Sequence, residues 1–592
     1  MHSINKRLEE LRKNMKNHSI DAIIIPSSDP HQSEYVSSHW QERKWISGFD
    51  GSSGTVAVTM DHAGLWTDSR YFLQGELQLK GTDVTLHKMT NQFSSPWVDF
   101  LVDNLAEGST VAINGMMFSK AGVDAIKKSF STSGIKLSYR NDLISDVWLD
   151  RPSLSDAAVE IHDVTFAGKD ISQKLKDIRS EMQTKGADLH MMTALDEVAW
   201  TFNIRGSDVE YNPVVIAYAI IGKEKAHFFI NKQKISPKLN LLFSKNQVEI
   251  HDYDSIIGFL NALDENNKIL VDPNICNQTL YEAINATILH GESIPKHLKA
   301  IKNETEIKHI RSVMKKDGAA IAETFYWMEE ELNANKSITE VTFAEKLANN
   351  RSKQKYYHGE SFGAIIGYKE NGAIIHYHPE SETCKTIEAN GILLVDSGGQ
   401  YSDGTTDITR TVSLGNTTAD QKKHYTLILK GMIALTHAKF PIGTMGVQLD
   451  TFARQFLWSN GLNFGHGTGH GVGFFLNVHE SPQGFAPGLS ERGKTVHKAG
   501  MLTSNEPGYY VEGQYGMRIE NLVLTTQSES AGFLEFETVT LYPFDHILLD
   551  KTLLTKEEIQ WINQYHKKVY AGIAPFLKGE VKTWFKEKCR RV

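Results

Sequence analysis

The chain has 592 residues, of which 40% are hydrophobic and 23% are charged. These values are typical of globular proteins and exclude collagen-like, low-complexity and wholly disordered chains. The 63 basic and 71 acidic residues leave a net charge of -8, which argues against general binding to nucleic acids or to anionic membranes.

The start of the chain and its cysteines indicate the compartment. The first ten residues carry several charges and no apolar core of the kind found in secretion signals. No stretch approaches the roughly 18 consecutive apolar residues that a membrane span needs. The three cysteines lie far apart, so they suggest neither a disulfide framework nor a thiolate metal site. We expect a soluble, cytoplasmic, multidomain protein with no nucleic-acid partner and no membrane association.

One pattern occurs twice in the N-terminal half, at an offset of 167 residues from Leu8 to Leu175. Leu8, Leu11 and Met15 have the spacing of one helical face, and an apolar run typical of a buried strand follows. The strands that we expect are Asp21–Ile25 and Thr55–Thr59 in the first copy, and Asp188–Met192 and Val214–Ala217 in the second. Because a whole register repeats, the pattern predicts a duplicated α/β domain.

Two segments indicate domain boundaries. Asp150–Asp156 is rich in Pro, Ser and Asp, which favour turns, so it reads as a linker. A third region opens near Lys302, where Asn303 can cap a helix and Glu306 stands three residues further on. We therefore expect three domains, over residues 1–152, 153–300 and 301–592, the last with a C-terminal extension.

Two aspartates in the third region lie at the ends of predicted strands. Asp396 follows the apolar run Ile392–Val395, and Asp407 opens a run rich in β-branched residues after a Gly-bearing loop. A hairpin would bring the two carboxylates to cross-strand distance. Carboxylates that close repel each other unless a cation or a shared proton lies between them. The alternative is that both aspartates only cap turns.

A glycine-rich segment follows, with glycine at every second position of Gly465–Gly473. The missing side chains would let the backbone approach a ligand closely. The segment presents His466 and His470, and His479 follows nine residues later. Neutral imidazole is the commonest metal ligand, so these histidines are candidate site residues.

Two glutamates complete the set. Glu506 stands at a predicted strand end before a Pro-Gly turn. Period-two alternation over Gly516–Val523 places Arg518 and Glu520 on the same face, a pair that a structural salt bridge would also explain.

The candidate metal ligands are Asp396, Asp407, His470, Glu506 and Glu520. Four carboxylates and one imidazole form a hard, oxygen-rich set that suits two divalent ions, Mn²⁺ first, with Zn²⁺ or Co²⁺ as alternatives. Two such ions about 3.5–4 Å apart would activate a shared water for hydrolysis.

The order and surroundings of these residues resemble the pita-bread metallopeptidase family, and within it cytosolic-type aminopeptidase P. The segments that carry the resemblance are Gly372–Tyr377, Asp396–Tyr401, Asp403–Thr411, His466–Gly473, Phe475–Glu480 and Asn505–Tyr510. Thr193–Trp200 and Asn203–Asp208 extend it over nearly the whole chain. The resemblance implies an α/β (α+β) fold in which two related creatinase-like domains precede a pita-bread catalytic domain. It also implies a homodimeric Xaa-Pro aminopeptidase, which removes the first residue from peptides with proline in the second position.

The resemblance implies how the five ligands divide between two metal ions. Asp396 and Asp407 would hold one ion together. The other ion would be held by Asp407, His470, Glu506 and Glu520, and Glu520 would bridge the two.

It also implies the catalytic residues. Glu506 would help take the proton from the attacking water. His376, His466 and His479 would bind the substrate and contact the transition state, and Arg518 would orient the site.

Two other functions stay open at this point. An Xaa-Pro dipeptidase, or prolidase, shares the metal set, although the duplicated N-terminal half argues against it. A pita-bread domain can also be a non-catalytic binding module, but such a module has no need to retain all five ligands.

Overall fold

The computed structural model describes residues 3–89, 95–139 and 142–592, and it divides into two compact units. The first unit comprises Met1–His162 and Lys169–Lys296, and the second comprises Asp163–Gly168 and His297–Val592. Among the described residues, no helix combines the length and the apolar character that crossing a bilayer requires.

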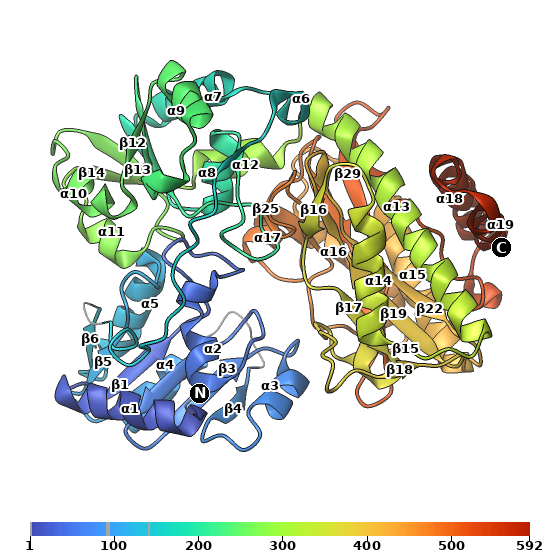
Figure 1. Ribbon diagram of the computed structural model, residues 1–592, viewed down its shortest axis with the longest axis horizontal. Coiled ribbons are helices and arrows are strands. Elements are labelled where there is room, and N and C mark those ends of the chain that lie inside the picture. The colour runs from blue at the N-terminus through green and yellow to red at the C-terminus, as the bar shows by residue number, and fades with distance from the viewer. Residues whose placement is uncertain (1–2, 90–94, 140–141) are drawn as a thin grey trace. The chain divides into compact units, whose positions relative to one another are not determined.

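The first unit contains two six-stranded sheets that share one topology, in the blue and in the teal to green parts of the chain in Figure 1. The strand orders are β4-β3-β2-β1-β5-β6 and β12-β11-β10-β8-β13-β14. The first sheet consists of β1 (Ala22–Ile25), β2 (Thr55–Thr59), β3 (Ala63–Thr67), β4 (Thr85–Lys88), β5 (Thr110–Ala112) and β6 (Lys136–Ser138). The second consists of β8 (Leu189–Met192), β10 (Tyr218–Gly222), β11 (Ala226–Phe229), β12 (Val248–His251), β13 (Lys268–Val271) and β14 (Thr287–His290). In each sheet the central strand has one antiparallel and one parallel neighbour.

The predicted duplication is confirmed by the matching topology of the two sheets. Strand β8 begins and ends 167 residues after β1. Helices α1 (Ile4–Asn17) and α7 (Ile171–Lys185) precede these strands and bury the expected apolar faces. Even a polar contact repeats, because Asp21 accepts a hydrogen bond from the Thr110 amide at 2.7 Å and Asp188 accepts one from the Lys268 amide at 2.8 Å. Each contact joins the start of the central strand to its parallel neighbour.

One strand prediction is wrong. Val214–Ala217 is buried but forms no strand, and β10 begins only at Tyr218. The Ile216 amide donates instead to the Asp208 carboxylate at 2.7 Å, so a preceding loop takes the hydrogen bond that a sheet neighbour would have received. The apolar run is longer than the strand, and periodicity alone does not show where pairing begins.

Helices flank both sheets of the first unit. They include α2 (Glu42–Ser47), α3 (Phe72–Gln78), α4 (Pro96–Asn104), α5 (Lys120–Phe130), α8 (Leu195–Thr201), α9 (Pro237–Lys245), α10 (Ile256–Asn261) and α11 (Gln278–Glu282). The predicted linker Asp150–Asp156 largely coincides with residues 151–159, which form neither helix nor strand. The division of this unit at 152 and 153 stays a prediction.

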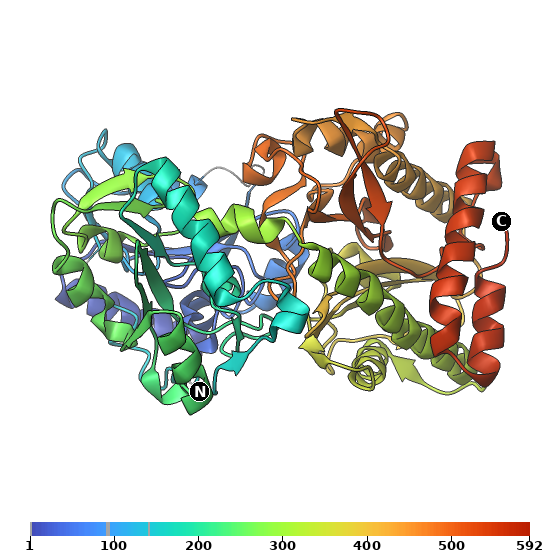
Figure 2. The same ribbon diagram turned by 90° about the horizontal axis from the view of Figure 1, so that it is seen from above.

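The second unit contains two main sheets, three smaller ones and several long helices. A three-stranded sheet contains β17 (Ile365–Tyr368), β19 (Ile392–Ser397) and β22 (Ile408–Ser413). A six-stranded sheet contains β23 (Phe440–Pro441), β24 (Gly469–Gly471), β25 (Glu480–Phe485), β26 (Leu502–Asn505), β29 (Asn521–Gln527) and β30 (Phe533–Thr538). The longer helices are α13 (Glu304–Asn333), α14 (Glu340–Ser352), α15 (Ala419–Thr436), α16 (Gly446–Trp458), α18 (Lys556–Ile573) and α19 (Gly579–Lys588). The last two lie side by side in Figure 1 and Figure 2.

Helix α13 begins as predicted. Asn303 caps it, and Glu306 completes a capping box through the Asn303 amide at 2.9 Å. The side-chain amide of Asn303 also donates to the Ala167 carbonyl at 2.9 Å. The short helix α6 (Val164–Ala167) therefore belongs to the second unit, although it precedes α7 in the sequence.

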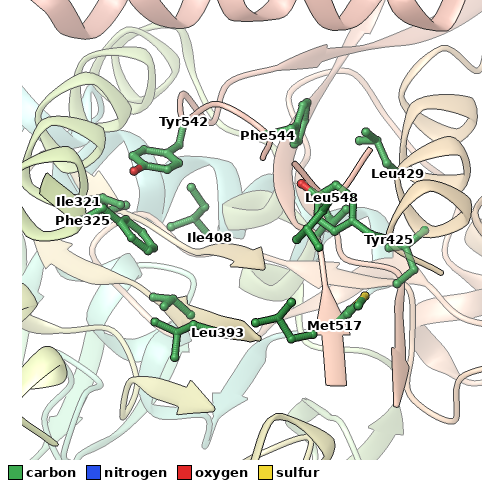
Figure 3. Close-up of a cluster of buried hydrophobic side chains, with 14 of the residues drawn as sticks. Ile321, Phe325, Leu393, Ile408, Tyr425, Leu429, Met517, Tyr542, Phe544 and Leu548 are labelled. Atoms are coloured by element: carbon green, nitrogen blue, oxygen red, sulfur yellow. The ribbon is translucent and has the colours of Figure 1, made fainter. Parts of the chain in front are cut away.

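The core of the second unit joins the helices to the sheets and the C-terminal segment. Figure 3 shows Phe325 of α13, Leu393 of β19, Tyr425 of α15 and Phe544 in one buried cluster. Leu393 is fully buried, and truncating such a leucine to alanine costs about 2–5 kcal/mol. This core holds β19 and β22 rigidly, and both strands lead to the candidate site.

Candidate functional site

The two aspartates lie where the predicted hairpin places them. Asp396 is in β19, directly opposite Thr409 of β22, and Asp407 immediately precedes β22. The loop between them contains the short strands β20 (Gly399–Tyr401) and β21 (Gly404–Thr405), which pair with each other. Both aspartates are buried, so neither is an exposed turn cap.

Two glycines beside His470 let the backbone of neighbouring strands approach closely. His470 lies in β24, between β25 and β26. A Cβ atom at Gly469 would lie 1.8 Å from the Ser504 carbonyl oxygen, and one at Gly471 would lie 2.4 Å from the Glu480 carbonyl oxygen. The prediction of close approach is correct for these two glycines, where the approaching group is the backbone of neighbouring strands. The narrow spacing fixes the strand that carries the imidazole.

The two glutamates meet because of strand register. Asn505 of β26 and Asn521 of β29 are partners across an antiparallel pair. Glu506 follows the first and Glu520 precedes the second, so both carboxylates emerge at the same end of the pair. The Glu520 amide donates to the Thr409 carbonyl at 3.1 Å, which ties this end to β22 and to the aspartates.

The predicted ligands converge. His470 Nε2 lies 3.5 Å from Asp407 Oδ2 and 3.4 Å from Glu506 Oε1. One ligand atom each from Asp407, His470 and Glu520 lie within 4.8 Å of one another. His470 Nδ1 lies 2.9 Å from the Gly471 carbonyl oxygen, and this contact orients Nε2 toward the carboxylates.

Hydroxyl groups orient two of the carboxylates. Thr409 Oγ1 donates to Glu520 Oε2 at 2.9 Å, and Ser504 Oγ donates to Glu506 Oε1 at 3.1 Å. Sequence reasoning missed both hydroxyl residues. Each stands in a strand as an ordinary polar residue, and no local pattern distinguishes it.

The carboxylates of this cluster fit a pair of cations. Within the described part of the chain, the buried atoms Asp396 Oδ1 and Glu520 Oε1 have no hydrogen-bond partner. Burial, followed by the charges of Asp396 and Glu506, raises the pKa of Asp407 well above its ordinary range. Burial likewise raises the pKa of Glu506 to about 7. Buried carboxylates with unfilled oxygens need a cation or a proton to offset their charge, which is otherwise costly in a low-dielectric site.

Arg518 is tied to Asp396 rather than to Glu520. Its Nη2 atom lies 2.6 Å from Asp396 Oδ2, so the salt bridge considered for Arg518 and Glu520 is not the one that forms. Its Nη1 atom donates to the Tyr510 hydroxyl at 2.6 Å. That hydroxyl lies 2.8 Å from His466 Nε2, so a continuous polar chain runs from Asp396 to His466.

The other two histidines, His376 and His479, lie close to this polar chain of hydrogen bonds or to the ligands. The His479 ring packs edge-on against His470 at 4.2 Å between centroids. His376 follows Ile375, whose carbonyl accepts a hydrogen bond from Arg518 Nη2 at 3.4 Å. His466 and His479 thus contact residues of the cluster, and His376 follows a residue that does. The roles of the three histidines stay predictions.

Family models match almost the whole chain. Two models described as the Creatinase/Prolidase N-terminal domain match residues 7–142 and 150–306. Metallopeptidase family M24 matches 308–527, and the C-terminal region of peptidase_M24 matches 532–592.

Full-length relatives carry consistent names. A "Probable Xaa-Pro aminopeptidase P" of Laccaria bicolor is 40% identical, covering 100% of this chain and 94% of the relative. "Aminopeptidase P2" of Arabidopsis thaliana is 37% identical, covering 95% of this chain and 84% of the relative.

Solved structures give the same match. An X-prolyl aminopeptidase from Caenorhabditis elegans, described as a cytosolic enzyme with a di-nuclear active site, superposes with a TM-score of 0.95. It is 35% identical, and 100% of both chains is covered. A prolidase from Pyrococcus horikoshii shares the fold at a TM-score of 0.50 and 24% identity, but covers 63% of this chain and 99% of its own.

Proposed function

Because the chain belongs to metallopeptidase family M24, we propose that it is an Xaa-Pro aminopeptidase, which releases the first residue from peptides with proline second. The observation that carries this proposal is the convergence of Asp407, His470 and Glu520 in a chain whose full-length relatives are named aminopeptidase P. The prolidase alternative is weaker, since the prolidase of Pyrococcus horikoshii covers less than two thirds of the chain.

The proposed cofactor is a pair of Mn²⁺ ions, because carboxylate-rich ligand sets favour harder cations than imidazole-rich sets do. Asp396 and Asp407 would hold one ion, and Asp407, His470, Glu506 and Glu520 would hold the other, with Glu520 shared. When bound, such a pair lowers the pKa of a water and neutralises charge that develops on the substrate carbonyl.

Glu506 would be the ligand that accepts a proton from the attacking water. Its side chain is 17% exposed, against 4% for Asp407 and 5% for His470, so it borders the open side of the cluster. Ser504 holds one of its oxygens, which keeps the carboxyl group in position while it gains and loses the proton.

Arg518 and Tyr510 position the groups that meet the substrate. The Arg518 guanidinium group donates to Asp396 Oδ2, so Oδ1 stays available for a cation. Tyr510 connects that arginine to His466 and therefore fixes where the imidazole points.

The substrate sets a particular demand. An Xaa-Pro bond has no N–H, and its proline ring fixes φ, so a site that recognises an amide N–H would reject it. The leaving proline nitrogen needs a proton, which His376, His466 or His479 can supply as an imidazolium. We propose that these three histidines bind the substrate, and that the enzyme is a cytoplasmic homodimer.

Peptide assays with the Mn²⁺-loaded protein test the activity. We expect release of the first residue from a tripeptide Xaa-Pro-Xaa and little cleavage of the dipeptide Xaa-Pro. Cleavage of the dipeptide alone would make the protein a prolidase, and no cleavage of either peptide would favour a binding module. Elemental analysis of the same sample should give two manganese ions per chain.

A further inference from the structure

A second cluster of metal-ligand side chains lies at the edge of the second N-terminal sheet, far along the sequence from the peptidase ligands. Strand β12 is the edge strand, and β11 is its parallel neighbour. His227 of β11 is the register partner of Glu249 of β12, and His251 lies two residues after Glu249. Register partners share a face, as do residues two apart, so the three side chains project from the same side.

The spacing of their donor atoms suits one small cation. His227 Nδ1 lies 3.4 Å from Glu249 Oε2 and 3.1 Å from His251 Nε2. One donor atom from each of the three residues lies within 4.8 Å of the others. A tetrahedral ion with bonds of about 2.0–2.1 Å separates its ligands by about 3.3 Å, close to both measured distances.

The surroundings hold these donors in place and leave a way in. Phe259 of α10 packs against both imidazoles, with ring centroids 4.6 Å apart for His227 and 5.7 Å apart for His251. Lys225 Nζ lies 2.6 Å from Glu249 Oε1, so the carboxylate presents its other oxygen to His227. The Glu249 side chain is 42% exposed, so solvent reaches the cluster.

The first N-terminal sheet contains a natural contrast at the same edge. His62 Nε2 and His87 Nε2 lie 3.0 Å apart, and His87 stacks on Trp66 as His251 stacks on Phe229. Phe100 covers this pair as Phe259 covers the other. The metal-ligand clusters found among the described residues include no group of three here. The duplicated scaffold thus provides two histidine pairs, and a carboxylate completes the ligand set in the second.

We propose that His227, Glu249 and His251 form a binding site for one Zn²⁺ ion on the second N-terminal domain, with water as the fourth ligand. Two imidazoles and one carboxylate plus an open position are a known zinc ligand set, and they suit Mn²⁺ less well than the oxygen-rich peptidase cluster does. A bound ion would link the edge strand β12 to β11 and stabilise that edge. The site is independent of the proposed peptidase activity.

Histidine footprinting on the full-length, Mn²⁺-loaded protein tests this site. Diethylpyrocarbonate modifies accessible imidazoles, and mass spectrometry of peptides reports the modification of each histidine. Adding Zn²⁺ should lower the modification rate of His227 and His251 severalfold, while excess Mn²⁺ should leave it unchanged. Equal rates with and without Zn²⁺ would overturn the proposal.

Two variants sharpen the test. Glu249→Gln keeps the shape of an exposed side chain, so the fold is expected to persist, and it should abolish the Zn²⁺ protection without changing the Mn²⁺-dependent peptidase rate. His62→Ala, in the histidine pair at the same edge of the first sheet, should leave the protection intact. Protection that survives Glu249→Gln, or that disappears in His62→Ala, would contradict a three-ligand site at β11 and β12.

The stoichiometry gives a second measurement. The double substitution His227→Ala and His251→Ala should lower the zinc retained after dialysis by one equivalent per chain. Unchanged zinc content would show that these residues hold none of it.

Discussion

The two ligand clusters of this chain differ in burial and in chemistry. Asp407, His470 and Glu520 are buried, whereas His227, Glu249 and His251 are partly exposed. The buried cluster leaves carboxylate oxygens without partners, whereas Glu249 is already paired with Lys225. The difference teaches that burial makes a group of like charges depend on bound cations or protons, while an exposed group of donors is stable with or without an ion.

Removing the metal should have the largest effect on activity, and it should act through the buried cluster. A chelator should abolish peptide hydrolysis, because the buried carboxylates then repel each other and no cation activates water. Adding Mn²⁺ should restore the rate, measured with an Xaa-Pro-Xaa peptide. Full activity in the presence of chelator would contradict a metal-dependent mechanism.

The substitution Asp407→Ala should have the next largest effect on activity. This aspartate is expected to contact both ions, so its loss should lower kcat/KM by about 10³-fold or more and reduce the bound metal. The matched control is Glu249→Gln in the exposed cluster, which should leave peptide hydrolysis unchanged. Steady-state kinetics with elemental analysis measures both, and a variant that keeps its metal and its rate would contradict the assignment.

Tyr510→Phe tests the polar chain beside the buried cluster. The variant loses the contacts with Arg518 and His466, so we expect kcat/KM to fall by about ten- to a hundredfold. The free energy of unfolding should change by only about 1–2 kcal/mol. Tyr509→Phe is the control, because Tyr509 precedes it in the same strand and packs against His424. Equal rates for the two variants would rule out a positioning role.

The smallest expected effect is on the pH dependence of stability. Burial raises the pKa of Glu506 from its ordinary value of 4.5 to about 7, so the folded metal-free protein binds more protons than the unfolded chain in that window. Its stability should therefore fall as pH rises from about 4.5 to about 7. Thermal unfolding should show a lower midpoint at the higher pH, and Mn²⁺ or Glu506→Gln should reduce the slope. An identical slope in all three samples would be inconsistent with this origin.

The sequence was sufficient for much of the fold because helix and strand periodicities are local. The register from Leu8 to Met15 recurs from Leu175, and the structure returns two sheets of one topology. The same local reasoning was wrong for Val214–Ala217, since hydrogen bonding to Asp208 depends on a loop that periodicity does not describe.

For the site, residue type and order identified the five candidate ligands, but not their neighbours. The partner of Arg518 is Asp396, which lies 122 residues away, and a strand pattern offered only Glu520. Thr409 and Ser504 escaped notice because a hydroxyl in a strand has no signature. The glycines of β24 were correctly associated with close approach, yet only the packed sheet showed that the neighbour is backbone.

The sequence by itself determined the duplicated N-terminal pattern and the candidate metal ligands, because these depend on residue type and spacing, and its motifs carried the resemblance to the family. Only the tertiary structure decided which side chains meet. His227 and Glu249 stand 22 residues apart, and parallel pairing of β11 with β12 makes them neighbours. Strand register is set by packing across the whole sheet, so contacts of this kind exist only once the chain has folded.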